Sequence, residues 1–170
     1  MDNILLLTTG SANSTITTKM LGELGWHLND ADDEFAESVE ARRINMATIK
    51  SGMFDRQSAM ALLNSLRSPW VLKDPRFSQT LRQWMPLFGP YRPLLLYITK
   101  DIGYVKNSIK RRFGMNGTIA EQRLKWCREY YRTWPYSKLQ FDVAQISAAV
   151  ALFDPGRSFK YNVDCQAENG

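Results

Sequence analysis

The sequence predicts an α/β domain of three layers, in which helices cover both faces of a central, mostly parallel sheet. Short apolar runs of the length of buried strands alternate with longer amphipathic stretches that fit helices. Each run ends in a polar turn. The chain has 170 residues, 44% apolar and 23% charged, which suits a single domain with one core. We expect this domain over residues 1–163, followed by a loose tail over residues 164–170.

The first half of the chain begins with a short apolar strand, followed by three helical patterns. Gly25 stands where the first helix should end, because glycine readily adopts the left-handed conformation of a C-terminal cap. In order, we expect a strand at Ile4–Leu7, a helix at Thr15–Leu24, an extended piece at Trp26–Leu28, an acidic loop at Asn29–Glu34, and helices at Phe35–Met46 and Asp55–Leu66.

The second half continues the alternation. A proline at Pro75 closes the second strand, since proline lacks the N–H that the sheet ladder needs, and Pro86 interrupts the helix that follows. We expect strands at Trp70–Leu72, Leu94–Ile98 and Lys138–Phe141, and helices at Phe77–Phe88, Tyr104–Phe113, Ile119–Trp134 and Val143–Phe153.

Composition narrows the classes of function. The net charge of +5 favours an anionic ligand, but no nucleic-acid-binding motif accompanies the basic residues, so we expect no nucleic acid partner. No apolar run reaches the length of a membrane span. Cys127 and Cys165 lie in unlike contexts, which predicts free thiols and a cytoplasmic protein. The one histidine, His27, makes a metal cluster unexpected and fits a structural role.

Two segments have the pattern of a phosphate-binding site, in which a strand ends in a turn that leads into a helix. Residues Gly10–Thr15 follow the first strand and open a helix, so backbone N–H groups and the helix N-terminus would face an anion. Lys100 follows the third strand, and Ser108 lies eight positions further on. Lys73 ends the second strand. Because parallel strands end at the same edge of a sheet, we expect these residues to converge there. They predict a ligand with phosphates at two ends.

These residues together resemble the sulfotransferases that use 3′-phosphoadenosine-5′-phosphosulfate (PAPS), especially short bacterial members. Trp70–Phe77 is similar to the family's W-x-x-K-D-P-R-[LF] signature, and Tyr97–Arg111 to its second block, with the same spacing from basic residue to serine. Gly10–Thr15 stands in the place of the 5′-phosphosulfate loop, and Glu37 with Asn45 resembles a further element. The resemblance covers most of residues 4–153 and implies a P-loop NTPase-like sulfotransferase fold.

The resemblance implies a transferase that moves a sulfuryl group from PAPS, without a metal, to a hydroxyl or amine of a small-molecule or glycan acceptor. Lys73 would stabilise the bridging oxygen. Glu37 would be the general base, with Glu34 and Asp33 as alternatives. The residues implied to bind PAPS are Gly10, Ser11, Ala12, Asn13, Ser14, Thr15, Lys100, Ser108 and Arg157.

Two departures from the family pattern leave other functions open. Asn13 replaces the usual cation of the loop, and Lys100 replaces an arginine, which removes a guanidinium fork. A non-catalytic protein of the same fold, acting as a nucleotide-binding or interaction module, is therefore the alternative. A P-loop kinase is a third reading. The loop argues against it, because it lacks the lysine of G-x(4)-G-K-[ST], and no Mg²⁺-binding carboxylate is evident in the sequence.

Overall fold

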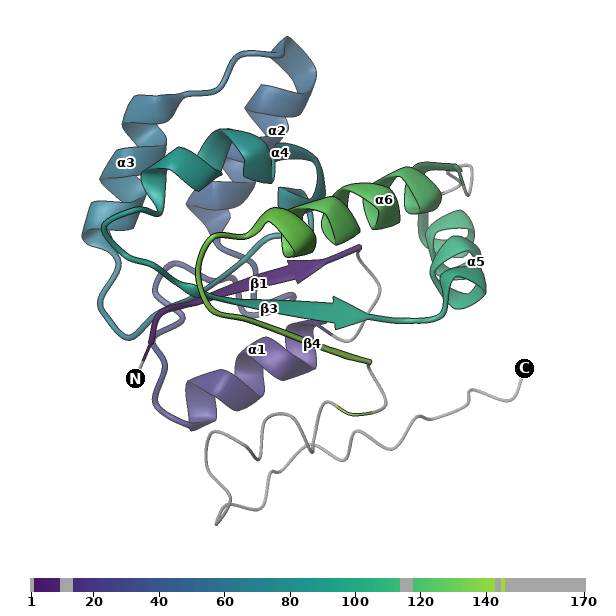
Figure 1. The fold of residues 1–170 in the computed structure, drawn as a ribbon, viewed down its shortest axis with the longest axis horizontal. Coiled ribbons are helices and arrows are strands. Elements are labelled where there is room, and N and C mark those ends of the chain that lie inside the picture. Colours follow the sequence, from purple (N-terminus) through teal and green to yellow (C-terminus); the bar gives the residue numbers. More distant parts are fainter. Residues whose placement is uncertain (1, 10–13, 114–117, 143–144, 146–170) are drawn as a thin grey trace.

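The computed structural model describes residues 2–9, 14–113, 118–142 and 145, and within them strands and helices alternate as the sequence predicts (Figure 1). The elements in chain order are β1 (Ile4–Thr8), α1 (Ser14–Glu23), α2 (Val39–Ser51), α3 (Arg56–Ser65), β2 (Val71–Lys73), α4 (Phe77–Trp84), the 3₁₀ turn η1 (Met85–Leu87), β3 (Leu94–Thr99), α5 (Ile102–Phe113), α6 (Thr118–Thr133) and β4 (Lys138–Asp142).

The four strands form one sheet in the order β2-β1-β3-β4, and every neighbouring pair is parallel. Ile4 at the start of β1 pairs with Val71 on one side and with Leu94 on the other, so the central strand is bonded along both edges. The piece expected around His27 makes a single parallel bridge to Trp70. The predicted parallel sheet is thus confirmed, with β1 near its centre.

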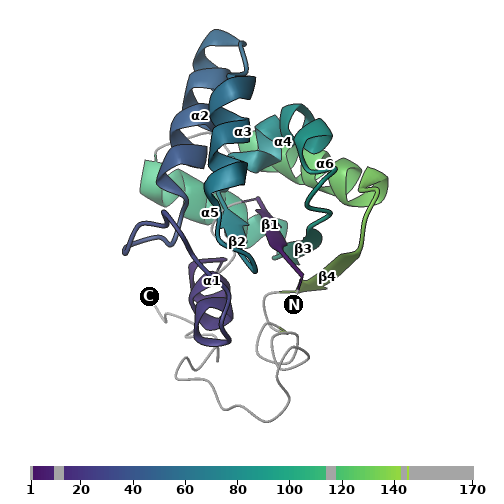
Figure 2. The ribbon, with the colours of Figure 1, turned by 90° about the vertical axis from the view of Figure 1, so that its left-hand side faces the viewer.

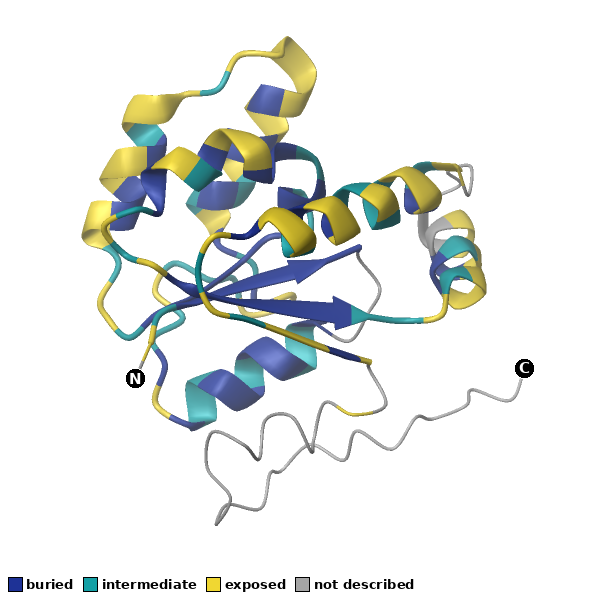
Figure 3. Ribbon diagram, in the orientation of Figure 1, coloured by how far each residue is buried: buried dark blue, intermediate teal, exposed yellow. Residues whose placement is uncertain are grey.

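Alternate residues of β1 enter two separate cores. Leu5 and Leu7 pack in a cluster that includes buried residues of α2, α3, α4 and α6. Ile4 and Leu6 pack in a second cluster with Met20 of α1. This alternation follows from the period of two in a strand. Figures 1 and 2 show α1 on one side of the sheet and α2, α3, α4 and α6 on the other, and Figure 3 shows β1 buried throughout. The three layers are confirmed.

The second helix differs from the expected one. It was predicted from Phe35, but α2 begins at Val39, and the Oγ of Ser38 caps it by accepting a bond of 3.1 Å from the N–H of Ala41. The backbone N–H of Phe35 instead donates to Oδ1 of Asp32 at 2.6 Å. The acidic loop therefore takes up backbone donors that a longer helix would have used, and residues 29–38 form a folded turn.

Two expectations at the chain's C-terminal end lie outside the described residues, namely the helix at Val143–Phe153 and the loose tail. The single domain expected over residues 1–163 therefore stays a prediction. The predicted helix at Phe77–Phe88 is α4 followed by η1, so the interruption at Pro86 takes the form of a 3₁₀ turn.

Among the described residues, none of the helices combines the length and the apolar character needed to cross a membrane.

Candidate functional site

The carboxyl ends of the parallel strands bring three predicted segments to one edge of the sheet (Figure 1). β1 ends at Thr8, β2 at Lys73 and β3 at Thr99. Of the predicted phosphate loop, Gly10, Ser11, Ala12 and Asn13 lie outside the described residues, as does Arg157. Ser14 and Thr15 open α1, as the strand–turn–helix pattern predicts.

Lys73 is buried where β2 meets the start of α1. Only 2% of the residue is exposed, and its Nζ donates a hydrogen bond of 3.2 Å to Oγ1 of Thr15. Nζ also donates to the backbone oxygen of Phe35. Burial lowers the pKa of Lys73, although the neighbouring carboxylate of Glu37 opposes that shift. The ammonium group expected at the reacting centre therefore lies against the first turn of α1.

The acidic loop before α2 holds these groups in place. Asp32 pairs with Arg42 through Oδ2 at 2.9 Å and accepts from the N–H of Phe35 through Oδ1. Ala36 has a φ of +50°, which turns the chain back so that the Phe35 oxygen meets both Lys73 and Thr15. The carboxylate of Asp32 thus shapes the loop beside the site.

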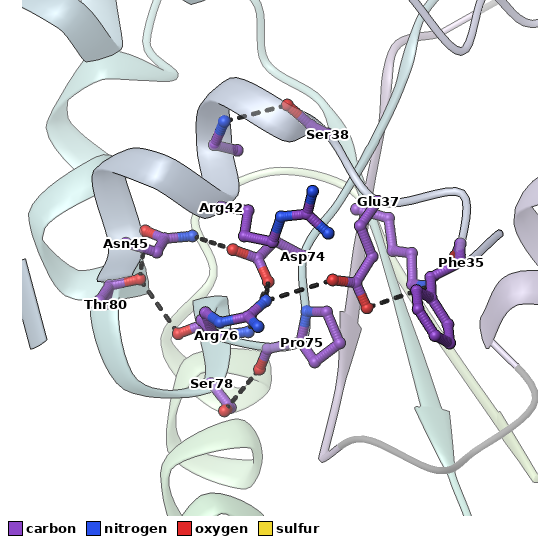
Figure 4. A network of polar contacts seen from close by, with 12 residues as sticks. Phe35, Glu37, Ser38, Arg42, Asn45, Asp74, Pro75, Arg76, Ser78 and Thr80 are labelled. Atoms are coloured by element: carbon purple, nitrogen blue, oxygen red, sulfur yellow. Dashed lines mark hydrogen bonds and ion pairs between the residues drawn. The ribbon is translucent and has the colours of Figure 1, made fainter. Parts of the chain in front are cut away.

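Glu37 lies between two cations. Its Oε1 is 3.7 Å from Nζ of Lys73, and its Oε2 accepts a hydrogen bond of 3.2 Å from Nη1 of Arg76. The same Nη1 donates to Oδ1 of Asp74 at 2.8 Å, and Figure 4 shows Arg76 between the two carboxylates. Among the predicted bases, Glu37 therefore joins Lys73, whereas Asp33 and Glu34 are exposed and have no ion pair among the described residues.

The buried side-chain amide of Asn45 holds Asp74, the carboxylate that pairs with Arg76. Nδ2 of Asn45 donates to Oδ2 of Asp74 at 2.8 Å, and Oδ1 of Asn45 accepts from the hydroxyl of Thr80 and the indole N–H of Trp84. Asn45 and Asp74 are both fully buried. The network fixes the turn after β2, and with it the position of Arg76 (Figure 4).

Asp74 does not fit the role of a magnesium ligand. Its Oδ1 accepts from both the backbone N–H and Nη1 of Arg76, and its Oδ2 accepts from Asn45. Within the described residues, no three side chains of His, Cys, Asp or Glu gather as a metal-binding group. Both oxygens of Asp74 are thus engaged by donors from within the described part of the chain.

In the second predicted phosphate site, Lys100 contacts an aromatic ring and Ser108 is buried. Nζ of Lys100 lies 3.3 Å from the centre of the Tyr104 ring, a cation–π contact. Ser108 is only 4% exposed. The assignment of Lys100 and Ser108 to a terminal phosphate stays a prediction.

Sequence reasoning underrated three residues of this region. Asn45 entered only as part of a motif, although it is the centre of the buried network. Arg76 also entered only within the Trp70–Phe77 signature, yet it is the second cation against Glu37. Arg123 of α6 was not considered, since one arginine on a helix carries no signal of its own. Only contacts across distant elements reveal these roles.

No model of a known protein family matches the chain, and neither does any curated protein. Among solved structures, the chain is similar to a gluconokinase from Sinorhizobium meliloti 1021, at 14% identity and a TM-score of 0.54, over 89% of this chain and 88% of that one. It is also similar to the YorR protein of Bacillus subtilis, solved in complex with phosphorylated GDP, at 14% identity and a TM-score of 0.45, over 88% and 95% of the two chains. The likeness to the gluconokinase shows the P-loop-like fold that the sequence predicts.

Proposed function

We propose that this protein is a transferase that moves a phosphoryl or sulfuryl group from a nucleotide to a hydroxyl or amine acceptor. The observation that carries the proposal is the burial of Lys73 at the end of β2, with its ammonium group 3.2 Å from Thr15 in the first turn of α1. A helix N-terminus after the central strand favours a phosphate, and a cation beside it favours charge that develops there.

In this mechanism the acceptor oxygen or nitrogen attacks the phosphorus or sulfur atom. The bond to the bridging oxygen breaks, and the leaving nucleotide phosphate keeps its electron pair. Lys73 would stabilise that oxygen. Its Nζ donates to Thr15 and Phe35, and its contact with Glu37 is longer than a hydrogen bond, at 3.7 Å. The third N–H of the ammonium group is therefore the donor that a ligand oxygen would accept from.

Glu37 is the proposed acceptor of the proton that the attacking group loses. It is the predicted base that the loop brings within ion-pair distance of Lys73, and its side chain is 12% exposed, so one side of the carboxylate meets solvent or substrate. Its two cationic neighbours hold it in place. Glu34 and Asp33 remain alternatives on the exposed part of the same loop.

Phosphoryl transfer is the first form of the proposal. The fold likeness to a gluconokinase supports it, because that protein is a kinase by name. The proposed donor is then a nucleoside triphosphate, bound at the loop before α1, and the acceptor is a small molecule.

Sulfuryl transfer from PAPS is the second form. The order of its motifs along the chain supports this form. Asp74 supports it as well, because its two oxygens accept hydrogen bonds from Arg76 and Asn45 and are engaged in the turn after β2. In this form Lys100 and Ser108 would bind the 3′-phosphate. If neither form of transfer is detected, the protein is a nucleotide-binding or interaction module without catalytic activity.

The test measures transfer from radiolabelled ATP with Mg²⁺ and from radiolabelled PAPS to a panel of hydroxyl and amine acceptors. Lys73→Met should lower the rate of transfer by about 100- to 1000-fold, the cost of losing one donor to a developing oxyanion. Nucleotide affinity should change little. Lys50→Met, at an exposed lysine of α2, is the matched control and should keep full activity.

Thermal stabilisation separates the two forms. 3′,5′-Adenosine bisphosphate should raise the melting temperature without metal if PAPS is the donor, and AMP should do much less. A saturating ligand at about 100 times its Kd adds about 2.7 kcal/mol to the free energy of unfolding. Stabilisation by ATP alone favours the phosphoryl form. If neither nucleotide stabilises the protein, the proposal is wrong.

A further inference from the structure

Arg123 on α6 is a half-buried cation with one buried donor that has no acceptor. Its Nε is inaccessible to solvent and forms no hydrogen bond, and none of the ion pairs among the described residues includes this guanidinium. Of the buried side-chain polar atoms in the described part of the chain, only those of Asp30 and Tyr97 share this condition. One of the five N–H donors of this arginine, the Nε–H, is thus buried without an acceptor, which is costly. The residue therefore calls for an explanation beyond packing.

The charged surroundings of Arg123 do not supply that partner. Burial lowers its pKa most, and the positive charge of Arg76 lowers it further, while Cys127 and Asp74 act in the opposite direction. The carboxylate of Asp74 is already shared between Arg76 and Asn45, and the thiol of Cys127 is protonated, because burial raises its pKa. The positive charge of Arg76 thus acts on Arg123. Arg76 is paired with both Asp74 and Glu37, whereas Arg123 has no ion pair among the described residues.

The fold places this pair at the candidate site. Arg76 stands in the turn between β2 and α4, and α4 packs against α6. Arg123 belongs to the second turn of α6, the end that lies beside α5 over the carboxyl ends of the strands (Figure 1). Cys127 and Tyr130, further along α6, are buried in the core that α4 also enters. That packing directs the Arg123 side of the helix toward the molecule.

We propose that Arg76 and Arg123 together bind a phosphate monoester group of a substrate. Guanidinium groups match the oxygens of phosphate through paired N–H donors. A phosphate dianion would supply the acceptor that Nε of Arg123 lacks. The inference rests on the proposed function at one point only, namely that the phosphate monoester belongs to a substrate of the transfer reaction. That substrate is either the nucleotide donor or an acceptor that is itself phosphorylated.

The test uses inorganic phosphate as the probe, with thermal melting at constant ionic strength. Arg123→Met keeps most of the side-chain volume and removes the charge. Arg128→Met changes an exposed arginine of the same helix and is the matched control. We expect Arg123→Met to weaken phosphate binding at least tenfold and Arg128→Met to leave it unchanged. Without phosphate, Arg123→Met should melt at the temperature of the native protein or higher, because a buried donor without an acceptor is gone.

A second set of ligands distinguishes the sources of the phosphate. If Arg123→Met also weakens binding of ATP or 3′,5′-adenosine bisphosphate, the pair binds the donor; if it weakens inorganic phosphate alone, the pair binds the acceptor. Equal phosphate affinity in Arg123→Met and Arg128→Met overturns the inference.

Arg123→Lys keeps the inference testable should the methionine variant fail to fold. Lysine retains the charge but not the fork of donors, so phosphate should bind at least threefold more weakly. Unchanged phosphate affinity in this variant would contradict the inference. The proposed function fails separately: absence of transfer by the native protein would overturn that function and leave Arg123-dependent phosphate binding intact.

Discussion

Nδ2 of Asn45 donates a hydrogen bond of 2.8 Å to Oδ2 of Asp74, across 29 positions of the sequence. The bond joins the middle of α2 to the turn after β2, and it lies behind the pair formed by Arg76 and Glu37. Since every atom of the link is buried, neither water nor a flexible side chain can replace it. The position of the candidate site depends on this contact.

Replacing Asn45 with alanine should destabilise the protein by about 2–4 kcal/mol, because Asp74, Thr80 and Trp84 would each lose a buried partner. Urea denaturation measures the change. Asn107→Ala, at an exposed position of α5, is the control and should stay within about 0.5 kcal/mol of the native protein. A similar small loss for both variants would mean that the network contributes little.

The stability of the protein should depend on the ionisation of Lys73. Burial lowers the pKa of this residue below its ordinary value of 10.5. Between the lowered pKa and 10.5 the unfolded chain binds more protons than the folded one, so the free energy of unfolding should rise with pH across that window. Denaturation of the native protein and Lys73→Met at a series of alkaline pH values measures the difference between them.

That difference should grow in favour of the native protein as the pH approaches 10.5. Lys50→Met, at an exposed lysine of α2, provides the comparison, and its free energy of unfolding should follow that of the native protein across this pH range. If the free energy of unfolding of Lys73→Met also changed with pH in parallel with that of the native protein, the burial of the Lys73 ammonium group would be contradicted.

Glu37→Gln should have two effects. It removes the negative charge between Lys73 and Arg76, so the protein should lose about 1–3 kcal/mol of stability. Inorganic phosphate should bind more tightly to this variant, because the cations lose a competing anion. Glu34→Gln, at an exposed site of the same loop, should show neither effect. Calorimetric titration measures the affinity for phosphate. An unchanged affinity in Glu37→Gln would argue against phosphate binding at the cations that contact Glu37.

The thiol of Cys127 should resist alkylation in the folded protein. It is buried, and burial raises its pKa, so almost no reactive thiolate forms near neutral pH. Iodoacetamide labelling followed by mass spectrometry of the peptide around Cys127 measures the rate, which should rise steeply in urea. Rapid labelling in native buffer would show that α6 opens readily from the core.

The sequence by itself determined the fold class and the place of the candidate site. Apolar runs such as Leu94–Ile98 and the turn at Lys73 follow from local chemistry, because side-chain period and proline act within a few residues. Parallel strands then place their carboxyl ends at one edge. This is why Lys73 and Thr15, far apart in the chain, were correctly expected to converge.

Only the tertiary structure decided which side chains meet there and how. Whether α2 begins at Phe35 or Val39 depended on Asp32, whose carboxylate competes for a backbone donor. Among the acidic residues of this loop, it is Glu37 that the fold brings within ion-pair distance of Lys73. Arg123 gained its significance from α6 packing against α4. Such contacts join residues that the sequence keeps far apart, and no local pattern encodes them.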